Sequence, residues 1–305
     1  MRIVRGLESV PPEPEPSAVA LGVFDGVHLG HRAILGTALT RARAAGLEAV
    51  ACTFDPHPME VLHPDRAPRP IATLDERLTL IAETGVDAAV VLAFTRELAA
   101  IEPEAFVKDV LLGRLRAREI VVGYNHRFGR GARGDARLLQ ELADRAGFRA
   151  HVVPPMTVEG AAVSSTEIRA ALQRGDVTTA ARDLGRPYTI AGLVTSGAGR
   201  GRTLGFPTAN IEAERPVLVA RGVYRGRIDV EGRQYSTVVN VGVRPTFGEA
   251  TLAVEAHVLD FTGDLYGHRV RVDLLERLRD EMRFPSVEDL KAQVARDIAA
   301  ARDRS

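Results

Sequence analysis

The first group of reactive side chains is the run His28-Leu29-Gly30-His31, which follows a short apolar segment and precedes a helical pattern. Backbone amides at the start of a helix, together with the positive end of its dipole, can hold an anion. Imidazole groups can donate hydrogen bonds to phosphate oxygens and stabilise charge that develops at phosphorus. Gly30 allows the backbone to approach a phosphate closely. The spacing therefore predicts a phosphate site at a strand-to-helix turn, and ordinary loop histidines are the alternative.

A glycine-rich loop followed by two oxygen donors forms a second group. Four glycines lie within the nine residues from 197 to 205, and their backbone amides can surround phosphates. The loop lacks the G-x-x-x-x-G-K-[ST] pattern of a Walker A loop, and such loops also make hairpin turns. Thr208 and Asn210 follow the loop and share one face if the chain is extended. Hard oxygen ligands of this kind suit Mg²⁺ held jointly with ATP phosphates.

A charged residue interrupts an alternating apolar segment near the C-terminal end. Glu255 and His257 lie two positions apart in residues 252–259, so an extended chain places both on one face. An inward carboxylate is costly unless it has a partner or a task. Glu255 is therefore a candidate catalytic group, and a solvent-facing glutamate on an edge strand is the alternative. His257 is assigned no catalytic role.

Around the first group, the spacing of apolar residues alternates along the chain between the pattern of a strand and the pattern of a helix. Apolar runs of strand character alternate with helical patterns of 10–15 residues, which predicts a parallel sheet with helices on both faces. Ligands of such sheets bind outside the carboxyl ends of the strands. The expected strands are residues 19–24, 47–54, 88–94, 120–123 and 150–153, and the expected helices are residues 30–44, 74–83, 103–115 and 135–146.

The second half of the chain has a different pattern. Two helices are expected up to residue 183, the first over residues 164–172, and five or six short strands then predict a small antiparallel barrel. The clearest strands are residues 188–194, 222–230, 234–241, 252–259 and 270–274. Ser286 reads as the N-cap of a final helix with Val287, Leu290, Val294 and Ile298 on one apolar stripe. The domain boundary is expected between residues 184 and 185.

Composition limits the classes of protein. The 305 residues suggest two domains, and 40 basic residues balance 40 acidic ones, which argues against a nucleic-acid-binding coat. The single cysteine, Cys52, excludes a disulfide framework, although a zinc site with His57 and His63 remains conceivable. No apolar stretch reaches the roughly 18 residues of a membrane span, and no secretory signal is evident. We expect a cytoplasmic protein that is a monomer or a weak homo-oligomer.

The run from Gly22 to His31, G-V-F-D-G-V-H-L-G-H, resembles the HxGH signature of nucleotidylyltransferases. More narrowly, it is similar to the N-terminal module of the bacterial bifunctional riboflavin kinase/FMN adenylyltransferase family. Residues 53–58, 122–129 and 164–169 match three further segments of that module in the same order. Asn125 stands where the family has Asp or Asn, whereas His126 stands where an aromatic residue is common.

The resemblance implies roles for individual residues of this module. Phosphates would be bound and stabilised by His28, His31, Asn125 and Arg169. Further contacts to ATP would come from Gly22, Phe24, Asp25, Gly30, Ser164, Ser165 and Thr166. The flavin would contact Phe54, Pro56, His57, Pro58 and Phe128.

The stretch G-A-G-R-G…G-F-P-T-A-N closely resembles the riboflavin kinase signature, and residues 240–248 and 254–267 match later blocks of that family. The resemblance implies a Rossmann-like nucleotidylyltransferase domain followed by a riboflavin-kinase barrel with a C-terminal helix. ATP would be bound by Gly197, Gly199, Arg200, Gly205 and Pro207. Thr208 and Asn210 would position magnesium and nucleotide, and Glu255 would be the general base.

The reactions implied by the resemblance are sequential. Riboflavin and ATP would give FMN, and FMN with a second ATP would give FAD and pyrophosphate, so flavins are substrates and products and Mg²⁺ accompanies ATP. Three alternatives remain open. The chain could be an adenylyltransferase for another phosphate ester, a protein with one of the two activities, or a flavin- or nucleotide-binding regulator.

Overall fold

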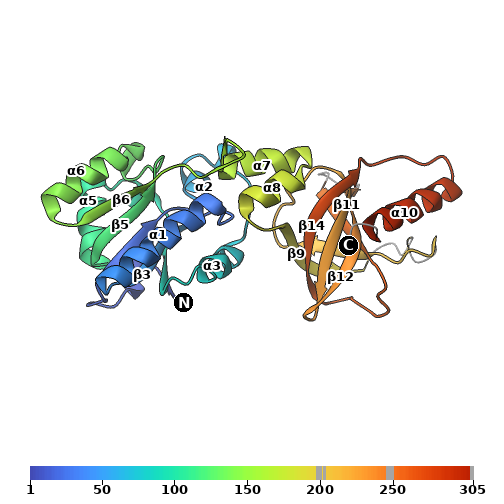
Figure 1. The fold of residues 1–305 in the computed structure, drawn as a ribbon, viewed down its shortest axis with the longest axis horizontal. Helices are drawn as coiled ribbons and strands as arrows, with labels where there is room; N and C mark the ends of the chain where they lie inside the picture. Colours follow the sequence, from blue (N-terminus) through green and yellow to red (C-terminus); the bar gives the residue numbers. More distant parts are fainter. Residues whose placement is uncertain (197–200, 202–203, 245–250, 303–305) are drawn as a thin grey trace. The chain divides into compact units, whose positions relative to one another are not determined.

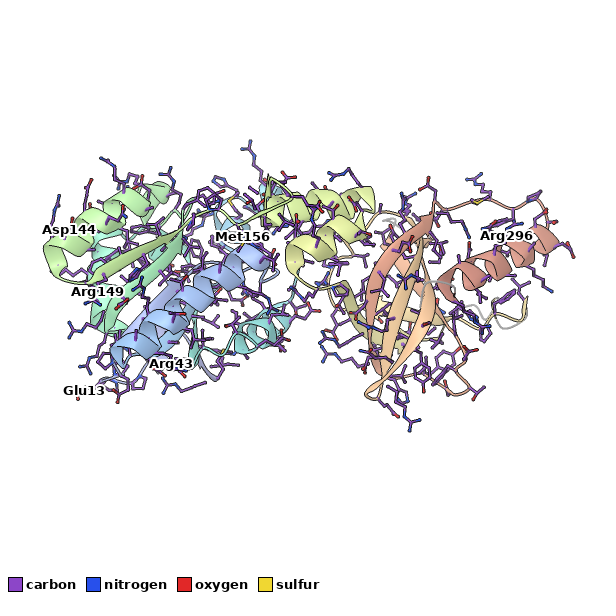
Figure 2. The ribbon with its side chains drawn as sticks, in the orientation of Figure 1. Glu13, Arg43, Asp144, Arg149, Met156 and Arg296 are labelled. Atoms are coloured by element: carbon purple, nitrogen blue, oxygen red, sulfur yellow. The ribbon has the colours of Figure 1, made fainter. Side chains whose placement is uncertain are left out.

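The computed structural model describes residues 1–196, 201, 204–244 and 251–302, and it divides into two compact units, Met1–Ser165 and Thr166–Ser305. Each unit has its own architecture (Figure 1). The boundary expected between residues 184 and 185 stays a prediction. Charged side chains such as Glu13, Arg43 and Asp144 are exposed on the outside of the first unit (Figure 2).

The first unit contains a six-stranded sheet with the order β1-β4-β3-β2-β5-β6, in which all neighbours are parallel. The strands are β1 (Arg2–Arg5), β2 (Ser17–Leu21), β3 (Glu48–Asp55), β4 (Ala88–Ala93), β5 (Ala117–Gly123) and β6 (Arg149–Val153). The predicted parallel sheet is confirmed. Strand β1 was not expected, because only Val4 of its four residues is buried and the segment has no apolar run.

Helices cover both faces of this sheet. The main ones are α1 (Leu29–Ala45), α3 (Leu74–Ala82), α5 (Pro103–Ala105), the π-helix η3 (Phe106–Arg114) and α6 (Ala136–Ala146). Small side chains such as Ala18, Ala20 and Ala51 face α1, which approaches the sheet closely, and side chains of α3 pack into the same core. Larger side chains such as Leu21 and Val50 face η3 and α6. Alternation along each buried strand thus supplies two different cores.

The helix expected over residues 103–115 is present over residues 103–114, and most of it is a π-helix. Leu115 N–H donates to the carbonyl of Val110, and residues 106–114 are π-helical rather than α-helical. Phe106 and Val110 face the core in either winding, so the spacing of apolar residues cannot distinguish the two. The short elements of this unit are η1 (Leu7–Ser9), α2 (Pro58–Leu62), η2 (Pro64–Arg66), α4 (Arg96–Ala99), η4 (Arg130–Ala132), β7 (Thr157–Val158) and β8 (Ala161–Ala162).

The second unit is a closed antiparallel barrel, which confirms the predicted architecture, and its strand order is β10-β13-β12-β11-β14-β9. Its elements are α7 (Ser165–Arg174), α8 (Val177–Leu184), β9 (Tyr188–Thr195), β10 (Ala209–Ala213), β11 (Gly222–Val230), β12 (Arg233–Arg244), β13 (Thr251–Val258), β14 (Arg269–Arg279) and α10 (Val287–Arg302). Strand β10 was not among the expected strands, because Asn210 and Glu212 interrupt its short apolar pattern.

The last helix begins at its predicted cap, since Ser286 Oγ accepts a hydrogen bond from Asp289 N–H at 3.1 Å. The expected apolar stripe is wrong at its first position, because Val287 is 49% exposed. The helix is held instead by its second half. Ala301 is fully buried, and the buried carboxylate of Asp297 pairs with Arg279 at 2.8 Å. No helix within the described residues is long and apolar enough to span a membrane.

Candidate functional sites

The turn that leads from β2 to α1 has an unusual backbone. Phe24, Gly26 and Val27 have positive φ angles of 56°, 77° and 40°. Such angles are uncommon for residues with a side chain and persist only where the surroundings enforce them. Phe24 and Val27 are fully buried, and Val27 N–H donates to the Phe24 carbonyl at 3.0 Å. The protein therefore holds this turn in a fixed shape at the carboxyl end of a central strand.

His28 and His31 meet at the start of α1. His28 is the N-cap of the helix, and its Nδ1 accepts a hydrogen bond from His31 N–H at 3.3 Å. The two rings stack with their centroids 3.6 Å apart. Because Nδ1 of His28 is an acceptor, the proton of the neutral ring lies on Nε2, which can donate to a phosphate oxygen. A Cβ at Gly30 would lie 3.1 Å from Cε1 of His28, so the glycine also makes room for that ring.

Several predicted phosphate contacts have structural tasks in the same turn. The Asp25 carboxylate is buried and accepts hydrogen bonds from the N–H groups of Ile71 at 3.0 Å and Ala72 at 3.2 Å. Ser165 Oγ donates to the Asp25 carbonyl at 3.1 Å. The side chains of Phe24 and Asp25 thus support the loop, and a direct contact of either with ATP stays a prediction.

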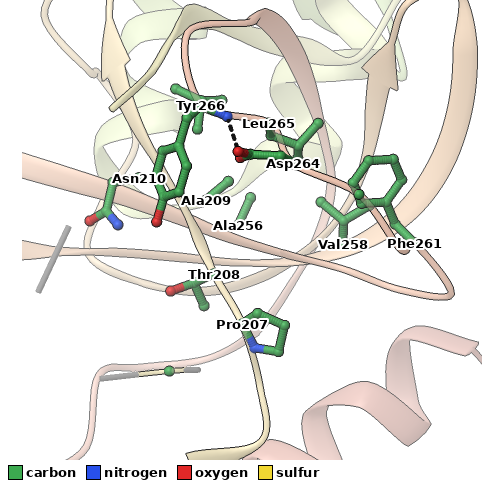
Figure 3. A pocket seen from close by; sticks show the side chains of 13 residues that line it. Pro207, Thr208, Ala209, Asn210, Ala256, Val258, Phe261, Asp264, Leu265 and Tyr266 are labelled. Carbon is green, nitrogen blue, oxygen red and sulfur yellow. Dashed lines mark hydrogen bonds between the residues drawn. The ribbon is translucent and has the colours of Figure 1, made fainter. Parts of the chain in front are cut away.

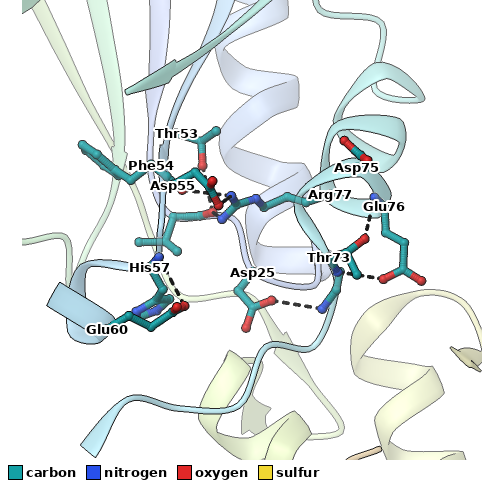
Figure 4. A network of polar contacts seen from close by, with 12 residues as sticks. Asp25, Thr53, Phe54, Asp55, His57, Glu60, Thr73, Asp75, Glu76 and Arg77 are labelled. Atoms are coloured by element: carbon teal, nitrogen blue, oxygen red, sulfur yellow. Dashed lines mark hydrogen bonds and ion pairs between the residues drawn. The ribbon is translucent and has the colours of Figure 1, made fainter. Parts of the chain in front are cut away.

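The predicted flavin segment follows β3 at the same edge of the sheet. Phe54 is 8% exposed and packs edge-to-face on Phe94, with the ring centroids 5.7 Å apart. The Asp55–Pro56 peptide bond is cis. His57 caps helix α2 through Nδ1, which accepts the Met59 N–H at 3.1 Å. The backbone N–H of His57 donates to Glu60 Oε1 at 3.3 Å (Figure 4). These contacts shape the segment, while the flavin contacts of Phe54, Pro56, His57 and Pro58 stay predictions.

The segment after β5 contains Asn125, which is exposed, and His126, whose Nε2 is buried without a hydrogen-bond partner among the described residues. Desolvation lowers the pKa of His126 to about 4, so the ring is neutral at neutral pH. It stacks on Phe128 with the ring centroids 6.1 Å apart. Phe128 is 7% exposed and also contacts Phe106 in the core. Its ring therefore anchors this segment to η3 in the core.

The remaining residues predicted for this site are divided between the units. Ser164 and Ser165 belong to the first unit, whereas Thr166 and Arg169 belong to the second. Thr166 is exposed and Arg169 is partly buried on α7. Their approach to the phosphates stays a prediction.

The second unit contains a cavity of about 130 Å³, shown in Figure 3. Thr208 and Asn210, the two predicted magnesium ligands, both line it, and Pro207 lies beside them. Asp264 and Tyr266 also line the cavity, and Asp264 Oδ1 accepts the Tyr266 N–H at 3.0 Å. The cavity therefore presents several oxygen atoms of the kind that Mg²⁺ prefers. Gly205 has a φ of 90°, while Gly197, Gly199 and Arg200 lie outside the described residues.

Glu255 lies in the middle of a polar row on the barrel. On β13 it is directly opposite Asn210 of β10 and Asn240 of β12. Its neighbours Val254 and Ala256 are buried, so alternation places Glu255 on the outer face, and the inward orientation expected from the sequence is wrong. The edge-strand alternative is also wrong, because β13 pairs on both sides in the closed barrel.

Comparison with known proteins identifies both units. A family model described as FAD synthetase matches residues 10–167, and one described as riboflavin kinase matches residues 184–305. The bifunctional riboflavin kinase/FMN adenylyltransferase of Escherichia coli K12 is 38% identical over 99% of this chain and 97% of its own length. The protein of the same description from Bacillus subtilis is 35% identical over 93% of this chain and 91% of its own length. The chain belongs to the bifunctional riboflavin kinase/FMN adenylyltransferase family.

The fold agrees with a solved relative over its whole length. A crystal structure described as a macrolide-efflux protein from Streptococcus pneumoniae matches this chain with a TM-score of 0.92, 32% identity and full coverage of both chains. The bifunctional riboflavin kinase/FMN adenylyltransferase of Pseudomonas fluorescens is 39% identical over 99% of this chain and 97% of its own length.

Family membership gives a physical context to one departure from the motif. His126 occupies a position where an aromatic residue is common, and here it is a neutral ring stacked on Phe128. An uncharged imidazole can therefore replace an aromatic ring in packing. The described residues contain no group of three His, Cys, Asp or Glu side chains that could hold a metal, and Cys52 is fully buried in the sheet.

Two residues that support the candidate sites, Asn240 and Arg77, were not predicted from the sequence. Asn240 received no role, although it lies opposite Glu255. Arg77 also received no role. It is only 6% exposed, but the helical pattern of the sequence does not show that this arginine is buried. Only the tertiary structure shows which backbone carbonyls such a side chain reaches.

Proposed function

We propose that the chain carries both reactions named by the family, with adenylyl transfer centred on the histidine turn and phosphorylation centred on the cavity of the barrel. The enzyme phosphorylates riboflavin to FMN with ATP and then adenylylates FMN with a second ATP to give FAD and pyrophosphate. The observation that carries this assignment is the pairing, within one chain, of the fixed histidine turn with the cavity that Thr208 and Asn210 line. Flavins are therefore substrates and products rather than resident cofactors.

Glu255 serves as general base in the kinase step. Its carboxylate accepts the proton of the ribityl 5′-hydroxyl while that oxygen attacks the γ-phosphorus of ATP, and ADP leaves. The amides of Asn210 and Asn240 lie directly opposite on either side, which supports a defined orientation of the carboxylate. Thr208 and Asn210 would hold Mg²⁺ with their side-chain oxygens, and the bound ion would neutralise phosphate charge.

Adenylyl transfer needs no general base. The FMN phosphate is already an anionic nucleophile, and its oxygen attacks the α-phosphorus of ATP as pyrophosphate leaves. Nε2 of His28 donates to a phosphate oxygen, and His31 supports that ring by stacking at 3.6 Å. Asn125 and Arg169 complete the stabilisation of charge. The amides of the turn at Gly22 and Gly30, with Ser164 and Thr166, contribute further donors.

The flavin of FMN lies against residues 54–58 in this proposal, with Phe128 as a further contact. We place both reactions in the cytoplasm, because each consumes ATP. The formal net charge of zero supports small-molecule substrates rather than nucleic acid, and the enzyme acts as a monomer or weak homo-oligomer.

The test is a time course with riboflavin, ATP and Mg²⁺, in which flavins are separated by chromatography. FMN should appear first and FAD later. His28→Ala should stop the reaction at FMN, and Glu255→Gln should slow FMN formation. His268→Ala changes a half-buried histidine of the barrel that contacts Glu231 and should match the wild type. FMN alone would confine the activity to the kinase. Bound flavin without conversion would contradict the enzyme assignment.

A further inference from the structure

A buried arginine joins the two loops assigned to ATP and flavin in the first unit. Arg77 is on α3 and is 6% exposed (Figure 4). Its Nη1 donates to the Val23 carbonyl at 2.9 Å, and its Nη2 donates to the Phe54 carbonyl at 2.9 Å. Val23 belongs to the turn that leads to His28, and Phe54 begins the predicted flavin segment. One guanidinium group thus holds both loops by their backbones.

The geometry of the bond donors suits this task. A guanidinium group is planar, and its donors have a fixed fork geometry, so two acceptors bound by it are held at a fixed separation. Thr53 Oγ1 donates to the same Val23 carbonyl at 2.9 Å. The carbonyls at these strand ends are therefore satisfied from α3 and β3, and neither loop can shift without breaking a buried hydrogen bond.

Helix α3 is itself attached to the histidine turn. The Asp25 carboxylate holds the N–H groups of Ile71 and Ala72, which lie immediately before the cap of this helix. The cap, Thr73, accepts the Glu76 N–H at 3.2 Å, while Glu76 accepts the Thr73 N–H at 2.7 Å. The histidine turn thus fixes the start of α3, and α3 in turn places Arg77 against the Val23 carbonyl of that turn.

The charge of Arg77 is balanced without a substrate. Burial lowers the pKa of Arg77, and the nearby carboxylates of Asp25, Asp55 and Glu60 oppose that effect. Arg77 Nη2 forms an ion pair with Asp55 Oδ1 at 3.7 Å. Both Nη atoms are engaged by carbonyl acceptors, and Nε is buried without a hydrogen-bond partner among the described residues. Because the side chain is only 6% exposed, a phosphate has no access to this cation.

We propose that Arg77 is a positioning residue for adenylyl transfer. It sets the separation between the histidine turn and the flavin segment and contacts neither substrate. The inference rests on the proposed assignment of these loops to ATP and FMN. It predicts that loss of Arg77 impairs the transfer of AMP to FMN while the phosphorylation of riboflavin in the other unit continues.

The experiment compares Arg77→Met and Arg77→Lys in the full-length chain, with FMN supplied for FAD formation and riboflavin supplied for FMN formation. Because misplacement of reacting groups by 1 Å can cost about 100-fold, kcat/KM for FAD formation should fall by about that factor in Arg77→Met. Arg77→Lys should retain intermediate activity, since an ammonium group keeps the charge but lacks the planar fork. The KM for FMN should rise in both variants.

The only cysteine reports whether the first unit remains folded. Cys52 is fully buried in β3, so a thiol reagent should label it only when that unit opens. Arg43→Met removes an exposed arginine that pairs with Asp87 and should leave both reactions unchanged. Leu139→Ala opens a cavity in the opposite core and should lower Tm without raising the KM for FMN.

Wild-type FAD formation with normal kinetics in Arg77→Met, while Cys52 stays protected, would overturn the proposal. Loss of activity that only follows loss of Cys52 protection would also overturn it, because Arg77 would then be merely structural. If the wild-type chain itself formed no FAD, the assigned function would have failed, which is a different result.

Discussion

The substitution Gly30→Ala, which adds one methyl group, tests the role of Gly30. Gly30 is the second residue of α1, where the backbone is helical, so Gly30→Ala is compatible with the main chain. The new Cβ would lie 3.1 Å from Cε1 and 3.2 Å from Nδ1 of His28. The His28 ring must then move by a few tenths of an ångström, because such contacts are tighter than ordinary van der Waals distances. The substitution thus perturbs the position of His28, the proposed phosphate ligand, more than the fold.

Two opposing terms keep the expected change in stability small. Alanine is favoured over glycine in a helix by at most about 1 kcal/mol. Displacing the His28 side chain from its rotamer costs about 0.5–1.5 kcal/mol. The net change in the free energy of unfolding is therefore within about 1 kcal/mol. For a folded unit of the size of Met1–Ser165, this corresponds to a shift of roughly 2–4 °C in Tm.

The expected loss of activity is larger than the loss of stability. A 1 Å misplacement costs about 100-fold, so a smaller shift together with the obstructed approach of phosphate should lower kcat/KM for FAD formation about tenfold. The assay supplies FMN and ATP and measures FAD by chromatography, while thermal unfolding is recorded on the same preparation. Riboflavin phosphorylation is the internal control. Wild-type FAD formation in Gly30→Ala, or a large fall in Tm, would refute the reasoning.

Three further predictions concern single side chains. Burial raises the pKa of the Cys52 thiol to about 12, so a thiol reagent should not label the folded chain at mildly alkaline pH, and labelling should appear on unfolding. The folded pKa of His126 is about 4 and its ordinary value 6.5, so stability present above pH 6.5 should be lost as pH falls towards 4, and His126→Phe should remove that part of the acid decline in Tm. Asn210→Ala should raise the Mg²⁺ concentration needed for riboflavin phosphorylation, measured by titration, while FAD formation from supplied FMN stays normal.

Elements with strong periodic patterns were predictable from the sequence. The expected strand at residues 88–94 corresponds to β4 (Ala88–Ala93), and residues 222–230 coincide with β11. Strands β1 and β10 were missed because each owes its place to pairing with neighbours rather than to an apolar run of its own. A short polar strand is stabilised mainly by the ladder it joins, and the sequence does not reveal that partner.

In the candidate sites too, features set by local sequence were predictable, whereas features set by tertiary pairing were not. Local spacing singled out His28, Thr208 and Asn210, which lie at the start of α1 and along one cavity, while their roles stay predictions. The orientation of Glu255 depended on closure of the barrel, which makes the face occupied by Val254 and Ala256 the inner one. Period-2 alternation predicts which residues share a face but not which face is the interior.

Positioning residues are the hardest to find, and the reason is physical. Arg77 acts through the carbonyls of Val23 and Phe54, and every residue type has the same carbonyl group. The sequence therefore contains no complementary side chain that would mark the contact. Asp25 acts similarly on two backbone N–H groups. Where catalysis depends on loops joined through their backbones, the residues that hold the loops at the required separation are evident only once the strands are placed beside each other.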